Sequence, residues 1–225
     1  ARLVGSEMCI RDRGDETDRG TELLKGAYAL DKPDDHRDFY REFAAHYDRS
    51  FAGALGYIYP VAIADAIGAA RLADGPVLDV GCGTGLVAEA IHKLRPDLVI
   101  HGVDLSPDML DKARGKGHYD ALFEADLTAD ISHLAGGYAA LVSAGTFTLG
   151  HLGPEPLSPL LEQCLPGAMA IIGVNRQHFE AEGFEAVLTN LHDKGRISSQ
   201  QQNEVHIYYG RDDEQSVDIA MCLQF

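Results

Sequence analysis

From residue 76 onward, short apolar runs bounded by Gly, Pro or charged residues alternate with segments whose apolar residues recur three and four positions apart. The first pattern is typical of buried strands, and the second is typical of helices with one buried face. Strands are predicted at residues 77–80, 98–103, 119–124, 138–143, 168–174, 204–209 and 217–223, and helices at 85–94, 107–114, 156–164 and 179–194.

This alternation predicts an α/β fold with a seven-stranded, doubly wound and mostly parallel sheet that carries helices on both faces. The last two strands are separated by the short acidic loop 210–215. A connection this short joins antiparallel strands, so we expect a C-terminal hairpin.

Two more helices are predicted before the sheet. Phe39, Phe43 and Tyr47 recur at four-residue spacing within residues 34–50, which would put them on one helical face. Residues 60–71 form the second predicted helix, with a proline at its first position. We expect the two helices to form a lid over the edge of the sheet.

Three segments follow from these patterns. Residues 1–13 lack an initiator Met, an apolar signal-peptide core and any helical or strand period, and they resemble a translated sequencing adaptor. We therefore expect residues 1–20 to be a non-native or disordered leader. Residues 21–75 are expected to form the helical lid, and residues 76–225 the sheet domain.

The charge and cysteine content narrow the possible partners. The net charge is -16, and the excess of Asp and Glu is spread along the chain, which disfavours binding to nucleic acid. No apolar run approaches the ~20 residues that cross a membrane. The four cysteines lack metal-ligand spacing, so we expect no metal and free, reduced thiols, as in a cytoplasmic protein. We further expect the protein to be a monomer or a homodimer.

The most specific pattern is Asp-Val-Gly-Cys-Gly-Thr-Gly at residues 79–85, where a predicted strand enters a glycine-rich turn and then a helix. Gly81, Gly83 and Gly85 remove side chains where a ligand must approach the backbone, and the start of the helix offers unpaired N–H groups. In a doubly wound sheet this turn lies at the carboxyl edge of the strands, where ligands bind.

The spacing of the turn distinguishes two kinds of cofactor. A dinucleotide-binding turn reads GxGxxG, and its third small residue would fall at Leu86. Here the spacing is GxGxG, and Asp79 would repel a pyrophosphate but attract an ammonium or sulfonium group. The turn therefore favours S-adenosylmethionine over the cofactor of a nicotinamide-dependent reductase.

Two further carboxylates follow predicted strands. Asp104 ends the second strand, where an acid can accept hydrogen bonds from both hydroxyls of a ribose. Asp126 follows the third strand and would meet an adenine amino group, while the backbone N–H of Leu127 would meet a ring nitrogen. The alternative interpretations are a helix-capping acid for Asp104 and an ordinary strand-ending residue for Asp126.

Residues from about 77 to 175 resemble the core of the class I S-adenosylmethionine-dependent methyltransferases. Residues 79–85 resemble the first motif of this family, residues 102–110 the second, residues 124–127 the third and residues 138–150 the fourth. The resemblance implies a Rossmann-like fold, with S-adenosylmethionine as methyl donor and S-adenosylhomocysteine as product. It implies a cofactor site at Asp79, Gly81, Cys82, Gly83, Gly85, Asp104, Leu105, Met109, Asp126, Leu127, Ser143 and Ala144.

The segment before the core is similar to that of the methyltransferase-like proteins related to the one encoded in the Williams–Beuren syndrome region. The match consists of the pair Tyr47-Asp48 and the stretch 56–60. This resemblance implies that Tyr40 or Tyr47 helps to cover the methionine end of the cofactor. For Tyr47, packing on the apolar face of a helix is the alternative.

The acceptor side has one candidate catalytic residue. His151 follows the fourth predicted strand, and the usual histidine pKa of about 6.5 suits a general base; a structural loop histidine is the alternative. Small residues at 143–145 would let the backbone pass close to the sulfonium. We expect a small-molecule acceptor, with a protein or peptide acceptor and a non-catalytic binding module as alternatives.

Overall fold

The computed structural model describes residue 48, residues 56–209 and residues 217–224. Several expected features lie outside the described residues: the leader at 1–20, Tyr40, Tyr47, and the helix at 34–50 apart from Asp48.

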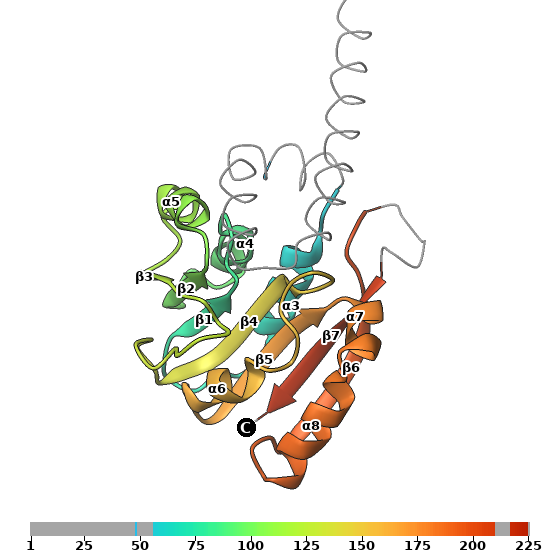
Figure 1. Cartoon of the computed structure of the whole chain (residues 1–225). Helices are drawn as coiled ribbons and strands as arrows, with labels where there is room; N and C mark the ends of the chain where they lie inside the picture. The colour runs from blue at the N-terminus through green and yellow to red at the C-terminus, as the bar shows by residue number, and fades with distance from the viewer. Residues whose placement is uncertain (1–47, 49–55, 210–216, 225) are drawn as a thin grey trace, which may run out of the picture.

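The described chain is built around one sheet, and Figure 1 looks onto its face, with the broad arrows of β4, β5 and β7 toward the viewer. Strands β1 to β5 run parallel to one another, and β7 pairs antiparallel with both β5 and β6. The strands are β1 (Val77–Val80), β2 (Ile100–Asp104), β3 (Ala121–Glu124), β4 (Tyr138–Phe147), β5 (Cys164–Val174), β6 (Ser199–His206) and β7 (Val217–Gln224), in the order β3-β2-β1-β4-β5-β7-β6.

This order confirms the predicted Rossmann-like α/β fold. The chain winds outward from β1 to β3 and then returns to the other side of β1 with β4. The carboxyl ends of β1 and β4 are therefore neighbours at the switch point of the sheet, where a doubly wound fold leaves room for a ligand.

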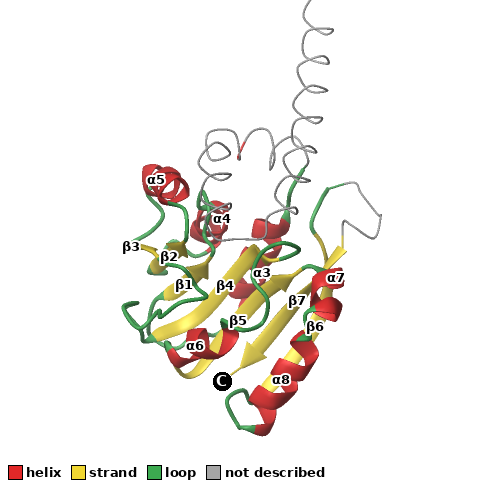
Figure 2. Ribbon diagram, in the orientation of Figure 1, coloured by secondary structure: helices red, strands yellow, loops and turns green. Residues whose placement is uncertain are grey.

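Helices cover both faces of the sheet, as Figure 2 shows. Strands β1 and β4 are buried on both faces because their side chains alternate between the two helical layers. One layer consists of α3 (Tyr59–Ala69), α4 (Leu86–Leu94) and α5 (Pro107–Lys116), and the other of α6 (Leu157–Glu162), α7 (Arg176–Ala181) and α8 (Phe184–Asp193).

The sequence predicts that helix α3 lies over the edge of the sheet. In the structure it lies on a face of the sheet instead. Its residues Tyr59, Ile63 and Ile67 are fully buried and belong to the same apolar cluster as Val77 and Ile171. The helix packs against α4, β4 and β5 because its inward stripe supplies part of the core. The described part of the expected lid is thus an integral layer of the fold.

Several other predicted elements have different bounds in the structure, among them β4, which ends at Phe147, and β5, which begins at Cys164. The helix expected at 179–194 is two helices, because the chain turns at Gly183, whose φ of 72° ends the helical path. Strand β6 begins at Ser199, five residues before the expected start at Glu204. Its first residues are polar and mostly exposed, so the apolar pattern gave no sign of them.

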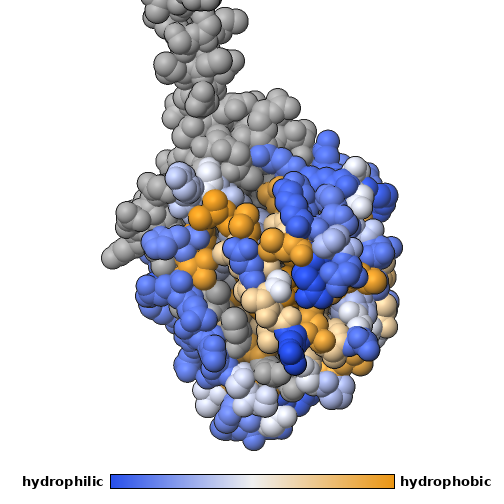
Figure 3. All heavy atoms as spheres, turned by 180° about the vertical axis from the view of Figure 1, so that it is seen from behind, coloured by the Kyte–Doolittle hydropathy of each residue, from blue (hydrophilic) through white to orange (hydrophobic). Residues whose placement is uncertain are grey.

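On the surface behind the view of Figure 1, apolar groups gather toward the middle of the face and hydrophilic groups surround them (Figure 3). Among the described residues, the large hydrophobic side chains that are exposed are Val61, Leu94, Val99 and Tyr209. None of the helices in the described ranges combines the length and hydrophobicity needed to cross a bilayer.

Candidate cofactor and acceptor site

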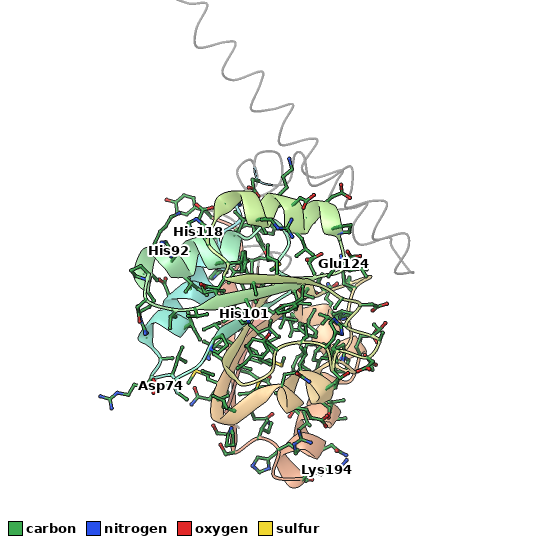
Figure 4. The ribbon with its side chains drawn as sticks, turned by 90° about the vertical axis from the view of Figure 1, so that its left-hand side faces the viewer. Asp74, His92, His101, His118, Glu124 and Lys194 are labelled. Atoms are coloured by element: carbon green, nitrogen blue, oxygen red, sulfur yellow. The ribbon has the colours of Figure 1, made fainter. Side chains whose placement is uncertain are left out.

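The predicted site residues that are described gather along the carboxyl edge of the sheet. Figure 4 shows the direction of the strands: Asp74 precedes β1 at one end, and Glu124 closes β3 at the other. The turn after β1 is held to β2 because the N–H groups of Gly81 and Cys82 both donate to the Val103 carbonyl, at 2.8 and 3.0 Å. The first two motifs therefore form one surface.

Asp104 joins these two motifs through its carboxylate. Oδ2 accepts a hydrogen bond from the Gly83 N–H at 2.8 Å, and Oδ1 accepts one from the Ser106 N–H at 2.9 Å. Burial raises the pKa of Asp104, and the hydrogen bonds from Ser106, Gly83 and Leu105 oppose the rise. A carboxylate that orders both loops is well placed to receive a polar ligand between them.

Helix α5 begins as its sequence predicts. The Ser106 hydroxyl accepts a hydrogen bond from the Met109 N–H at 3.3 Å, which caps the helix after β2. Met109 is buried in the apolar cluster beneath the helix, and Leu105 is partly buried beside it.

Asp79 is the most unusual group at this edge. It is fully buried, and Tyr119 donates a hydrogen bond from its hydroxyl to Oδ2 at 2.6 Å. Oδ1 has no hydrogen-bond partner among the described residues. Burial raises the pKa of Asp79 to about 7, a rise that the Tyr119 hydrogen bond opposes and the nearby charge of Asp104 increases. A cationic ligand would supply what this carboxylate lacks.

The glycines of the turn differ in how closely they are packed. Gly81 has a φ of 66°, and a Cβ added to it would lie 2.0 Å from the Thr146 hydroxyl oxygen. Gly83 has a φ of 53°, and no described atom lies within 4 Å of the corresponding Cβ position. Gly81 is thus required by the neighbouring strand, whereas Gly83 leaves open space above the turn. The Cys82 side chain is buried, and burial raises the pKa of its thiol.

The third motif follows β3. Asp126 is partly buried, and its Oδ1 accepts hydrogen bonds from the Thr128 N–H at 2.9 Å and the Thr128 hydroxyl at 2.6 Å. The Leu127 side chain belongs to the apolar core, so its backbone is the part that can face a ligand.

The end of β4 is attached to the end of β1 by two hydroxyls. Ser143, which is fully buried, and Thr146 both donate to the Val80 carbonyl, at 2.8 and 3.0 Å. The side chain of Ser143 is therefore committed to the scaffold. Ala144 is partly buried and Gly145 is exposed, so small residues do keep the backbone accessible here.

The loop after β4 carries His151, and hydrogen bonds fix its shape. His151 Nδ1 lies 3.0 Å from the Leu149 carbonyl oxygen. Because a carbonyl only accepts, Nδ1 carries the proton, and Nε2 is the basic nitrogen of the neutral ring. The buried His178 on α7 donates from Nε2 to the Leu152 carbonyl at 2.8 Å. His178 thereby anchors the loop that presents His151.

Two matched parts of the segment before the core lie against this edge. The Asp48 carboxylate accepts a hydrogen bond from the Thr84 hydroxyl at 2.5 Å and pairs with Lys116 at 2.7 Å. The Tyr57 hydroxyl lies 2.9 Å from where a Cβ on Gly145 would be. Asp48 thus contacts the glycine-rich turn, and Tyr57 contacts the end of β4.

Sequence reasoning missed several of these contacts. Tyr119 falls at the start of a predicted strand, Thr146 falls in the fourth motif without a role of its own, and His178 lies outside all four motifs. No local signal could have found them, because each acts on a residue far away in the sequence. Tyr119, for example, is 40 positions from Asp79.

The residues present fit a sulfonium nucleoside with an amino acid tail. The unpartnered oxygen of Asp79 matches an ammonium group, the open space above Gly83 admits ligand atoms, and Asp104 supplies a carboxylate at the end of the next strand. Within the described ranges, His, Cys, Asp and Glu side chains form no group of three suited to a metal ion.

Comparison with known proteins agrees with this geometry. A family model described as a methyltransferase domain matches residues 77–166. Human methyltransferase-like protein 27 is 33% identical over 168 residues, which cover 70% of this chain and 66% of that protein.

Solved structures share the fold. A TehB-like SAM-dependent methyltransferase from Corynebacterium glutamicum has a TM-score of 0.59 and 22% identity over 83% of this chain and 98% of its own. The plantazolicin methyltransferase BpumL, in complex with a pentazolic desmethylPZN analog and SAH, has a TM-score of 0.59 and 15% identity over 92% of this chain and 99% of its own. At these identities the similarity concerns the fold.

Proposed function

We propose that this chain is a class I S-adenosylmethionine-dependent methyltransferase and that it methylates a small-molecule acceptor by in-line displacement. The proposal rests on three features that lie at one edge of the sheet. One oxygen of the buried Asp79 carboxylate has no partner among the described residues, no described atom fills the space at Gly83, and the Asp104 carboxylate lies beside the turn. S-adenosylmethionine supplies a methyl group activated by its sulfonium and leaves as S-adenosylhomocysteine.

The residues of this chain divide the work of binding the cofactor. Asp79 accepts the ammonium group, Asp104 accepts the ribose hydroxyls, and Asp126 with the backbone of Leu127 recognises the adenine. Gly81, Gly83 and Gly85 let the ligand approach the backbone, while Cys82, Leu105, Met109, Ser143 and Ala144 line or support the site. Tyr40 or Tyr47 covers the methionine end.

His151 is the proposed general base. Its Nδ1 proton is held by the Leu149 carbonyl, so the basic Nε2 would take the proton of an acceptor hydroxyl, thiol or amine. Positioning of the acceptor and the methyl donor supplies the rest of the rate acceleration, because holding two reactants in line can lower the activation barrier by up to ~7–11 kcal/mol.

Charge supports a small, neutral or cationic acceptor. A net charge of -16 opposes a polyanion. The BpumL structure, which has the same fold, contains a pentazolic analog. We infer a closer kinship with the Williams–Beuren-related proteins from the match at Tyr47-Asp48 and residues 56–60, which is supported by the contact of Asp48 with Thr84.

The direct test incubates the protein with S-adenosylmethionine and a panel of hydroxyl, thiol, amine and carboxyl metabolites, with S-adenosylhomocysteine formation as the readout. Turnover with a metabolite supports the proposal. Turnover with a peptide library alone would assign a peptide acceptor, and tight cofactor binding without any turnover would identify a binding module.

The same assay tests the base. His151→Ala is expected to lower turnover by about 10²–10⁴-fold while leaving cofactor affinity intact. The matched control is His92→Ala, an exposed histidine of α4 that Figure 4 shows away from the carboxyl edge. Full activity of His151→Ala would remove the catalytic assignment.

A further inference from the structure

The hydrogen bond between Tyr119 and Asp79 joins a residue of the first motif to a residue that lies outside all four motifs. Tyr119 lies in the turn between α5 and β3, and its hydroxyl reaches across the sheet to a carboxylate on β1. The turn is anchored at the next residue, because Asp120 donates its N–H to the Ile100 carbonyl at 2.8 Å and accepts the Ile100 N–H at 3.0 Å.

Two glycines make room for the Tyr119 ring. A Cβ on Gly85, at the start of α4, would lie 2.9 Å from one edge of the ring, and a Cβ on Gly102, in β2, would lie 2.9 Å from the other. Contacts this short do not occur between real side chains. The ring is therefore wedged between two backbone segments, which fixes its hydroxyl against Asp79.

We propose that Tyr119 is a positioning residue that holds one oxygen of Asp79, turns the other toward the ammonium group of the cofactor, and sets the pH range in which the cofactor binds. The inference rests on the proposed role of Asp79 as the ammonium acceptor. A carboxylate held on one side only, whose other oxygen is buried and has no partner among the described residues, is neutralised either by a proton or by a cationic ligand.

The charges around Asp79 determine the direction of the pH effect. Burial raises the pKa of Asp79 the most, the Tyr119 hydroxyl lowers it, and the charge of Asp104 on β2 raises it further. Among the described residues, Cys82 in the turn is a further titratable group that interacts with Asp79, Asp104 and Tyr119. The residues paired with Asp79 in the adjacent strands, Gly102 and Val142, carry no charge. With its pKa at about 7, Asp79 loses its negative charge as the pH falls through neutrality.

The test compares Tyr119→Phe with the unchanged protein by calorimetric titration of S-adenosylhomocysteine between about pH 6 and pH 8.5. Phenylalanine keeps the wedged ring and removes only the hydroxyl. Without its donor, Asp79 holds its proton to higher pH, so affinity at pH 7 is expected to fall about tenfold and to recover toward pH 8.5. Titration of the ligand's own amino group affects both proteins equally.

A second ligand and a second variant separate positioning from packing. Methylthioadenosine has the same nucleoside but lacks the amino acid, so Tyr119→Phe should leave its affinity unchanged. In an Asp79→Asn background, Tyr119→Phe should cause no further loss of S-adenosylhomocysteine affinity, because the hydroxyl acts through the carboxylate. Tyr138→Phe is the matched control, since Tyr138 is a buried tyrosine whose hydroxyl lies 3.4 Å from His101 Nδ1 on β2.

Three results would overturn the inference: an unchanged pH profile in Tyr119→Phe, an equal loss of methylthioadenosine affinity, or an additive loss in the double variant. Failure of the underlying role of Asp79 has a different signature. In that case Asp79→Asn itself would bind S-adenosylhomocysteine as tightly as the unchanged protein does, whatever residue stands at position 119.

Discussion

The two sides of the carboxyl edge satisfy their polar groups in different ways. On the proposed cofactor side, formed by residues 79–85 and 104–106, a buried carboxylate oxygen of Asp79 has no partner among the described residues, and no described atom lies within 4 Å of the Cβ position of Gly83. On the proposed acceptor side, formed by residues 143–152 and 175–178, of which Ser143 and Ala144 also support the proposed cofactor site, the hydroxyl of Ser143 and the ring of His178 donate to backbone carbonyls.

The difference indicates how each side works. An incomplete polar environment costs stability in the free protein, and a ligand that completes it gains affinity. A satisfied environment holds its shape without a ligand, as a loop that must present His151 should. We therefore propose that a ligand completes the polar environment of the cofactor side, whereas the acceptor side keeps its shape without a ligand.

The largest expected effect is on the contact that joins the two sides. In Gly81→Ala the new Cβ would overlap Thr146, and the residue would stay at a positive φ, which costs about 1–2 kcal/mol alone. Loss of the Thr146 hydrogen bond adds about 1 kcal/mol, so we expect about 3 kcal/mol of destabilisation in denaturant unfolding.

The control for this variant is Gly117→Ala. Gly117 also has a positive φ, 73°, but no described atom lies within 4 Å of its Cβ position. It should lose only the backbone contribution of about 1–2 kcal/mol. Equal losses in the two variants would mean that the packing of β4 against the turn is unimportant.

An intermediate effect is expected at Asp104. Asp104→Ala removes the proposed ribose acceptor and the bonds that order Gly83 and Ser106, so cofactor affinity should fall about 10–100-fold in calorimetry. Asp97→Ala, which alters an exposed pair with Arg95, should leave the affinity unchanged. If the two variants bound the cofactor alike, the cofactor side would not include β2.

The smallest effect is expected on the acceptor side. Ser143→Ala removes one donor to the Val80 carbonyl, which keeps its bond from Thr146, so we expect only about 1 kcal/mol of destabilisation. Cofactor affinity should stay within about twofold, because the hydroxyl is committed to the scaffold. A tenfold loss of affinity would contradict the contrast between the two sides, since the Ser143 side chain would then contact the ligand.

Much of this architecture could be predicted because the relevant signals are local. The strands β1 and β2, the glycine-rich turn and the Ser106 cap are each encoded within a few neighbouring residues. The polar start of β6 and the break at Gly183 could not be predicted from apolar periodicity. An edge strand can be polar, and one glycine is compatible with either a continuous or a broken helix.

The sequence alone determined that Asp79, the glycines and Asp104 would lie at one sheet edge, because parallel strands align their carboxyl ends. Only the tertiary structure decided which residues contact this edge. Tyr119 donates a hydrogen bond to Asp79, the Ser143 hydroxyl donates one to the Val80 carbonyl, and Thr146 packs against Gly81. The reason is that a hydrogen-bond partner is selected by proximity in the folded chain, and strand order brings together residues that the sequence keeps 40 or more positions apart.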